Sequence, residues 1–145
     1  MKIFSGTSNR PLAEKIAKKL GTDLSPLEIH VFPDGEKRIQ IQKRVVDEDT
    51  VVVQSTSTPT AENFMELFFI VDGLKRSGAK SITAVVPYLG YQRQDHVFRD
   101  GEAVSLEVIV NLIKAMKVDR VISFDLHAPR ISEFFVNKRI KMDHL

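Results

Sequence analysis

At 145 residues, of which 43% are hydrophobic, the chain has the length and apolar content of one globular domain. It contains no cysteine, which excludes disulfides, thiolate nucleophiles and cysteine-ligated zinc and is compatible with a reducing compartment. The apolar stretches fall short of the roughly 20 residues of a membrane span, and a net charge of +2 with interleaved basic and acidic residues gives little support to nucleic-acid binding. We therefore expect neither a membrane nor a nucleic-acid partner.

The first third of the chain predicts a strand, a helix and a hairpin. Residues 2–5 have a strand pattern, and the turn and capping residues at 6–9 precede a helix over 11–20. Residues 28–32 and 37–42 both have the pattern of extended chain. A turn at 33–35 joins them, so we expect a β-hairpin near residues 28–42.

The rest of the chain repeats a strand-helix pattern. Strands are predicted at 50–54, 81–86 and 120–124, and helices follow through 64–74, with Thr60 as the expected cap, and at 106–116. This alternation predicts an α/β fold, a mostly parallel sheet flanked by helices. A short helix is expected at 131–135, its phenylalanines and those at 64–69 being core. Residues 138–145 show no closing element, and we expect the chain to end at a domain edge.

Polar segments follow Gln54, Val86 and Phe124, each at the end of a predicted strand. Because the carboxyl ends of parallel strands lie at one edge of a sheet, we expect these segments to open onto one rim. The hydroxyl-rich residues 55–60 precede a helix and suit a phosphate, although routine capping explains most of them.

The loop at residues 87–96 is too long for a simple connection and mixes tyrosines with charged and amide side chains. Arg93 can make a forked contact with a phosphate, and Gln94 can recognise the edge of a base or sugar. A solvated loop with surface ion pairs explains these residues about equally well.

Two further pairs of side chains suit ligand binding. Asp34 and Glu36 flank Gly35, so both carboxylates can turn toward one ligand, although Asp-Gly is also a plain hairpin turn. Asp125 and His127 are two residues apart at a strand end and suit a divalent cation, although a hydrogen-bonded pair without metal explains them too.

Taken together, these segments resemble the ribose-phosphate pyrophosphokinases. The likeness runs in the family's order along nearly the whole chain, through residues 4–9, 32–36, 65–67, 87–95 and 125–127. It implies a phosphoribosyltransferase-like fold, with residues 1–145 as the amino-terminal ATP-binding domain of a two-domain enzyme. That enzyme transfers the diphosphate of ATP to ribose 5-phosphate with Mg²⁺ present, giving phosphoribosyl pyrophosphate and AMP.

The resemblance also implies roles for single residues. Adenine would be contacted from a neighbouring subunit of a homo-oligomer, and ATP and Mg²⁺ would otherwise be held within one subunit. The residues for adenine are Phe32, Asp34, Gly35 and Glu36; those for ATP are Arg93, Gln94, Asp95 and His127; those for the metal are His127 and Asp125.

The family's ribose 5-phosphate loop and its catalytic Lys and Arg belong to a second domain that this sequence does not include, so we expect the chain to be inactive alone. A cytoplasmic location is implied. Gln92 stands where the family usually has alanine, and Arg130, Ser132 and Glu133 replace its Gln, Gln and Gly. Because of these departures, a second hypothesis is that the chain is a non-catalytic relative that assembles with or regulates the enzyme. A third hypothesis is a nucleotide-binding module with an unrelated function, since a fold does not by itself fix function.

Overall fold

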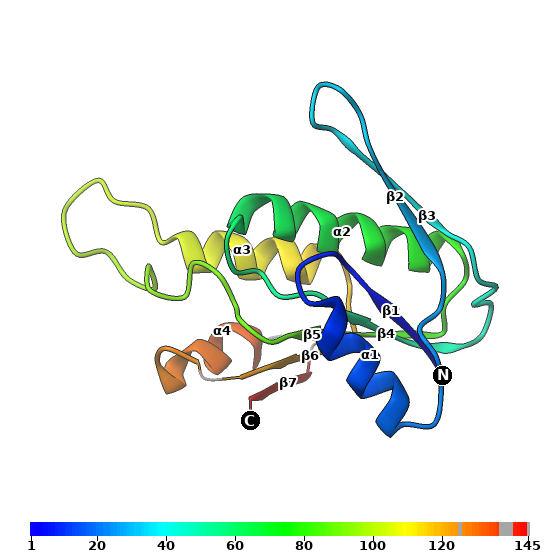
Figure 1. Cartoon of the computed structure of the whole chain (residues 1–145). Helices are drawn as coiled ribbons and strands as arrows, with labels where there is room; N and C mark the ends of the chain where they lie inside the picture. Colours follow the sequence, from blue (N-terminus) through cyan, green and yellow to red (C-terminus); the bar gives the residue numbers. More distant parts are fainter. Residues whose placement is uncertain (125, 137–140, 145) are drawn as a thin grey trace.

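Among the described residues, a five-stranded parallel sheet forms the centre of the molecule (Figure 1). The computed structural model describes residues 1–124, 126–136 and 141–144. In the described chain the strand order is β1-β4-β5-β6-β7. The strands are β1 (Lys2–Ser5), β4 (Asp49–Val53), β5 (Ser81–Val86), β6 (Arg120–Ser123) and β7 (Lys141–His144). The predicted fold class is therefore confirmed.

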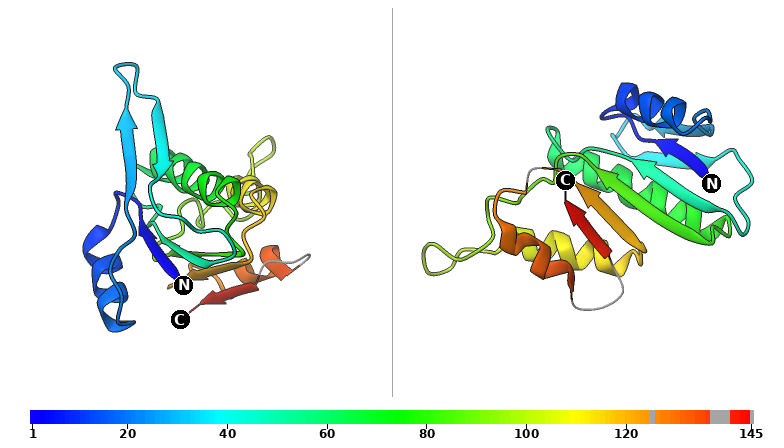
Figure 2. Two further views of the ribbon diagram at one scale, coloured as in Figure 1. Left: turned by 90° about the vertical axis from the view of Figure 1, so that its right-hand side faces the viewer. Right: turned by 90° about the horizontal axis from the view of Figure 1, so that it is seen from below.

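Helices cover both faces of the sheet, which is why its central strands are almost continuously apolar. One face is covered by α1 (Arg10–Lys19), and the other by α2 (Thr60–Arg76) and α3 (Ser105–Ala115), as Figure 2 shows. Neighbouring strand residues alternate between the two cores: Val52 packs with α2 and α3, whereas Val53 packs with α1. The chain continues from β6 into a 3₁₀ turn (Pro129–Ser132) and α4 (Glu133–Val136). None of the described helices is long and apolar enough to cross a bilayer.

The predicted hairpin is present and forms a separate antiparallel sheet. Its strands are β2 (Leu27–Val31) and β3 (Lys37–Ile41), paired from Leu27 opposite Ile41 to Val31 opposite Lys37. Leu27, Ile39 and Ile41 pack against the core beneath α2 and α3, whereas the turn projects away from the body of the molecule (Figure 1).

Strand β7 corrects the expectation that residues 138–145 contain no closing element. Residues 141–144 pair in parallel with β6, with Lys141 opposite Arg120. The Arg120 guanidinium donates to the Asp143 carboxylate at 2.6 Å and, as the largest cause, lowers the pKa of Asp143 below its usual range. A short polar segment carries little strand signal of its own, and here the open edge of β6 supplies the pairing.

Two smaller expectations about α2 are wrong. Thr60 is the first helical residue rather than the cap; Pro59 occupies the cap position and makes no side-chain capping bond. Phe69 is predicted to lie in the core but is 38% exposed. Its neighbours Phe68 and Ile70 face the core, whereas Phe69 lies on the outer side of α2. The other four phenylalanines of the two helical segments pack in or against the core.

Gly90 marks a close approach of the loop after β5 to the start of α2, and its substitution tests this packing. A Cβ there would lie 2.6 Å from the Thr56 carbonyl oxygen and 2.5 Å from Thr60 Cγ2. Because backbone must move, we expect Gly90→Ala to lower the free energy of unfolding by about 1–3 kcal/mol, measured by urea denaturation.

Gly73→Ala is the matched control. Among the described residues, a Cβ there would meet only the Ile41 side chain, 3.2 Å from its Cγ1, and no backbone atom outside its own helix, and a gain of about 1 kcal/mol in helix propensity offsets the crowding. Equal losses in the two variants would contradict the close approach.

Candidate functional site

Three loops are joined by hydrogen bonds at the carboxyl edge of the sheet. Thr56, after β4, donates from its backbone N–H and its hydroxyl to the Tyr88 carbonyl at 2.9 and 2.8 Å. The same hydroxyl accepts the Gly90 N–H at 2.8 Å. The segments after β4 and β5 are therefore fixed to each other.

The segment after β6 joins the same rim. Phe124 N–H donates to the Pro87 carbonyl at 3.4 Å, and His127 N–H donates to Oε1 of Gln92 at 2.9 Å. Gln92 is buried, with 4% of its surface exposed. The prediction that the segments after Gln54, Val86 and Phe124 open onto one rim is confirmed.

The loop at residues 87–104 has a framework of its own. Gln94 receives the Leu106 N–H at its carbonyl, 3.1 Å away, and its side-chain amide donates to the Ala103 carbonyl at 3.4 Å, which joins the two ends of the loop. Farther out, the Glu102 carboxylate accepts the backbone N–H groups of Phe98 and Arg99 at 3.0 and 3.1 Å. These bonds hold the loop in one shape over a length at which an unstructured connection would be unusual.

Charged and aromatic groups are distributed unevenly in this loop. Asp95 is buried, with 7% of its surface exposed, and its carboxylate lies 2.6 Å from Nδ1 of His96. Arg93 is exposed, although Gln92 before it is buried and Gln94 after it is half-buried. The Tyr91 ring lies 5.9 Å from the Phe64 ring and stays 40% exposed. A cation and an aromatic ring thus face solvent from a braced loop, which suits a phosphate and a flat ring.

The hairpin turn presents the second group of predicted residues. Gly35 has φ +90°, which favours glycine, and its N–H donates to the Phe32 carbonyl at 2.9 Å. One oxygen of Asp34 accepts the Glu36 N–H at 3.0 Å. The side chains of Phe32, Asp34 and Glu36 are exposed. Asp34 therefore serves the turn and still presents a carboxylate to solvent.

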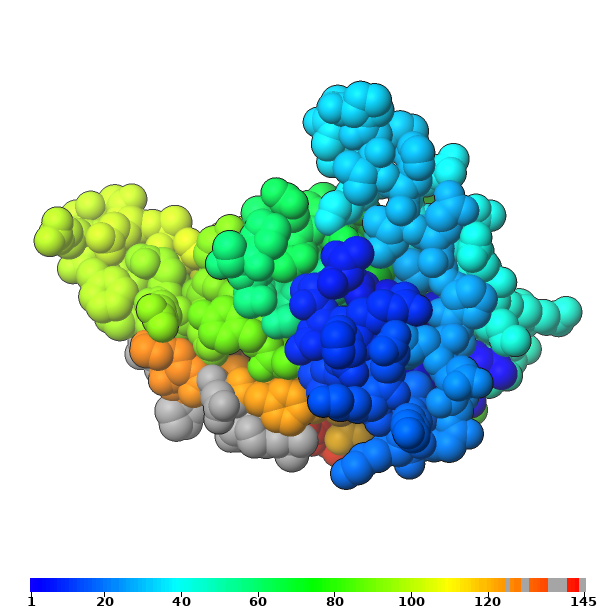
Figure 3. All heavy atoms as spheres, in the orientation of Figure 1, coloured from blue at the N-terminus to red at the C-terminus, as the bar shows by residue number. Residues whose placement is uncertain are grey.

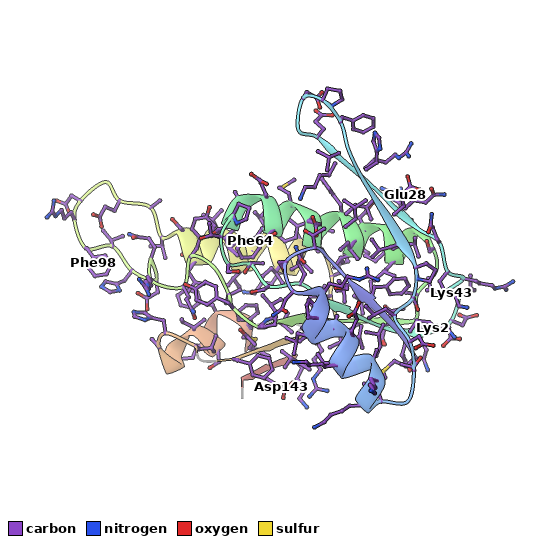
Figure 4. All side chains as sticks on the ribbon, viewed as in Figure 1. Lys2, Glu28, Lys43, Phe64, Phe98 and Asp143 are labelled. Carbon is purple, nitrogen blue, oxygen red and sulfur yellow. The ribbon has the colours of Figure 1, made fainter. Side chains whose placement is uncertain are left out.

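The structure does not bring the two groups together within one chain. The space-filling view in Figure 3 shows the hairpin and the loop 87–104 as two separate projections. Figure 4 shows the same separation in side chains, with Phe98 at the far end of the loop and Glu28 in the hairpin on the other side of α2. Arg93, Gln94, Asp95 and His127 share the rim, whereas the hairpin turn is remote from it.

Of the two predicted metal-binding residues, only His127 lies among the described residues. Asp125 lies outside the described residues, and His127 is exposed at the rim with its backbone held by Gln92. Over residues 1–124, 126–136 and 141–144, no three His, Asp or Glu side chains cluster as a metal site. Because magnesium prefers oxygen ligands, an imidazole such as that of His127 could contact it only beside oxygens supplied by other groups.

A buried carboxylate network was missed by the sequence reasoning. Glu66 of α2 has no exposed surface; its Oε2 accepts from Nζ of Lys37 at 2.7 Å and its Oε1 accepts the Thr7 N–H at 2.6 Å. Nε2 of Gln54 donates to Oε1 at 3.1 Å. Gly6 lies so close that a Cβ would meet both the Gln54 and Glu66 side chains. The available signal was a carboxylate at a buried helical position, beside Leu67 and four residues before Ile70.

Three comparisons with known proteins agree on one family. Residues 1–116 match the model described as the N-terminal domain of ribose phosphate pyrophosphokinase. The chain is 47% identical over its whole length to a ribose-phosphate pyrophosphokinase of Fusobacterium nucleatum and 43% identical to one of Corynebacterium ammoniagenes. It spans 45% of the length of each of these relatives.

The fold agrees with a solved structure as well. The crystal structure of phosphoribosylpyrophosphate synthetase from Mycobacterium smegmatis superposes with a TM-score of 0.91 at 32% sequence identity. The match covers 99% of this chain and 48% of that one. The phosphoribosyltransferase-like architecture expected from the resemblance is thus present.

Gln92 can be tested as the link between the loop and the His127 segment. Gln92→Leu fills a similar volume but leaves the His127 N–H without its acceptor, so we expect unfolding free energy to fall by about 1–3 kcal/mol. Hydrogen exchange at the His127 amide should become faster. In Gln92→Glu the acceptor oxygen remains and protection should largely persist; equal protection in the parent and the leucine variant would contradict the link.

Proposed function

The chain belongs to the ribose-phosphate pyrophosphokinase family, because residues 1–116 match the model of that family's N-terminal domain. On this premise we propose that the chain is the ATP-binding half of a ribose-phosphate diphosphokinase. The whole reaction transfers the β,γ-diphosphate of ATP to ribose 5-phosphate. Because the chain spans under half the length of its relatives, the ribose 5-phosphate site and the catalytic Lys and Arg are proposed to lie in a second domain. The proposed enzyme works in the cytoplasm.

The observation that carries the proposal is the braced rim. Arg93 is exposed on a loop that is fixed to its neighbours by Thr56 and Gln92, so its planar guanidinium can make a forked contact with the phosphates without ordering the loop first. Gln94 lies beside it, and its amide oxygen is proposed to contact the nucleotide. The buried Asp95 orients His96 at the same rim.

Diphosphoryl transfer depends on positioning and charge neutralisation more than on a covalent protein intermediate. Magnesium, when bound, supplies charge neutralisation on the phosphate oxygens, and His127 and Asp125 are its proposed contacts on this chain. The work of the chain is then to hold the triphosphate at Arg93 and to keep the His127 segment at a fixed place through Gln92.

The adenine site is proposed to be shared between two copies. Phe32, Asp34 and Glu36 are exposed in the turn of the hairpin, which projects separately from the loop 87–104 of its own chain (Figure 3). An exposed aromatic ring beside two carboxylates suits a purine and its amino group. The hairpin of one copy would therefore complete the rim of another, in a closed homo-oligomer.

The ATP role is tested by calorimetric titration of the chain with ATP and magnesium under conditions where light scattering confirms an oligomer. Removing a charged hydrogen-bond donor should weaken binding, and we expect Arg93→Ala to lose roughly 10- to 100-fold in affinity. Arg76→Ala, which removes an exposed ion pair with Asp72 at the end of α2, should bind like the parent. Absence of binding by the oligomeric parent would instead favour a non-catalytic relative.

Sharing of the site is tested by mixing two variants that each bind ATP weakly. When Asp34→Ala and Arg93→Ala chains exchange subunits at equal amounts, roughly a quarter of the sites should combine an intact hairpin with an intact rim. The measured stoichiometry of tight ATP binding should recover to that level. A mixture of Asp34→Ala with Glu36→Ala alters every hairpin and should recover nothing; equal behaviour of the two mixtures would exclude a shared site.

A further inference from the structure

Within the part of the chain that the structure describes, one side-chain polar contact joins the hairpin to the body, and it lies close to the turn. Lys37 is the first residue of β3 and directly follows the turn. Its ammonium, on a residue with 16% of its side chain exposed, lies 2.7 Å from Glu66 in α2. Among the described residues, this is the only ion pair or side-chain hydrogen bond that joins β2 or β3 to another element.

The carboxylate that receives Lys37 is itself immobilised. Thr7 donates to it from both its backbone N–H and its hydroxyl, at 2.6 and 2.9 Å. Gln54 donates to it at 3.1 Å and lies within 3.4 Å of Asn63. Residues from the ends of β1 and β4 and from α2 therefore fix the position at which the ammonium binds, and a buried carboxylate with this many donors keeps one orientation.

Among the described residues, no hydrogen bond or ion pair joins residues 32–36 to the body. The backbone bonds of residues 32–36 stay within the hairpin. Between Gly35–Lys37 and the outer side of α2 lies a cavity of about 520 Å³ that Met65 and Phe69 help to line. Nonpolar packing begins lower down, at Ile39 and Ile41. A two-stranded hairpin twists readily without such support.

The turn lies beyond the Lys37 contact, so a small rotation of the hairpin about Lys37 displaces the turn residues. Asp34 precedes Lys37 by three residues across the turn and lies at most about 10 Å from it. A swing of about 20° would then move its carboxylate by up to roughly 3–4 Å, and displacements near 1 Å at a binding group already weaken function strongly. A small loss of attachment at Lys37 therefore produces a large error at the turn.

We propose that Lys37 and Glu66 are positioning residues that hold the hairpin turn, residues 32–36, at the angle at which it meets the nucleotide on a second copy of the chain. The inference rests on the proposed function of the turn. The inference goes beyond the turn residues themselves. The direction of the hairpin is set in the body of the same chain, where Thr7 and Gln54 hold Glu66 in place.

The absence of cysteine allows the angle to be measured directly. Cysteines introduced by Pro33→Cys in the turn and Leu112→Cys on α3, both at exposed positions, carry nitroxide labels. Labelled chain is diluted with unlabelled chain, so that pulsed electron spin resonance reports distances within one copy. The parent should give one narrow distance distribution.

A pair of variants distinguishes loss of the hairpin's attachment from loss of the folded structure. Lys37→Met leaves a buried carboxylate without its cation, whereas Lys37→Met with Glu66→Gln removes both charges and spares that penalty. In the double variant, with circular dichroism confirming the fold, we expect the distribution to widen at least twofold and ATP affinity to fall about tenfold. Lys37→Arg keeps the cation and should restore the narrow distribution. The control Arg38→Met breaks the neighbouring exposed pair with Glu28 inside the hairpin and should change neither readout.

The two readouts distinguish the possible failures. A narrow distribution in the folded double variant, while the parent binds ATP, would overturn the positioning role. A widened distribution with unchanged ATP affinity would overturn it as well, because the angle would not matter to binding. If the distribution widens but the parent itself binds no ATP, the proposed function fails and the inference fails with it. In the full-length enzyme, loss of adenine positioning should raise KM for ATP with little change in kcat.

Discussion

The parallel pairing of β4 with β5 and of β5 with β6 places the carboxyl ends of three strands at one edge of the sheet. Each of these strands is covered on both faces, so its own side chains are occupied with packing. Polar residues are left to the segments that follow the strands. The hydrogen bonds of Thr56 to Tyr88 and of His127 to Gln92 then combine those segments into one surface.

The hairpin follows a different physical logic. It is not part of the main sheet, and its turn is stabilised from within, through Gly35 and the bond from Glu36 N–H to Asp34. Its attachment to the body combines packing at Ile39 and Ile41 with one ion pair, Lys37 to Glu66. Such an element can extend far from its own domain, which is what a site shared between two copies requires.

Burial explains why the two glutamine contacts and the glutamate network hold their geometry. Gln54, Glu66 and Gln92 are all nearly inaccessible to water, and a buried polar group that loses its partner is costly to the fold. Each therefore fixes two chain segments that are distant in sequence. The contacts that join these distant segments are thus made by side chains that are shielded from solvent.

Local sequence determined the elements and their order up to α4, but not β7. The apolar run at 50–54, the helical period from Phe64 to Leu74 and the Asp-Gly turn at 34–35 predicted β4, α2 and the hairpin, and parallel alternation was enough to place the segments after Gln54, Val86 and Phe124 together. Tertiary structure alone decided that β7 pairs with β6, that Glu66 receives Lys37 and that Gln92 receives His127 N–H. The physical reason is the separation of the partners in sequence. Periodicity indicates which way a residue faces within its own helix or strand, whereas these three contacts join residues 21 to 35 positions apart. Which partner meets the open edge of β6, the buried carboxylate of Glu66 or the buried amide of Gln92 depends on how the elements pack.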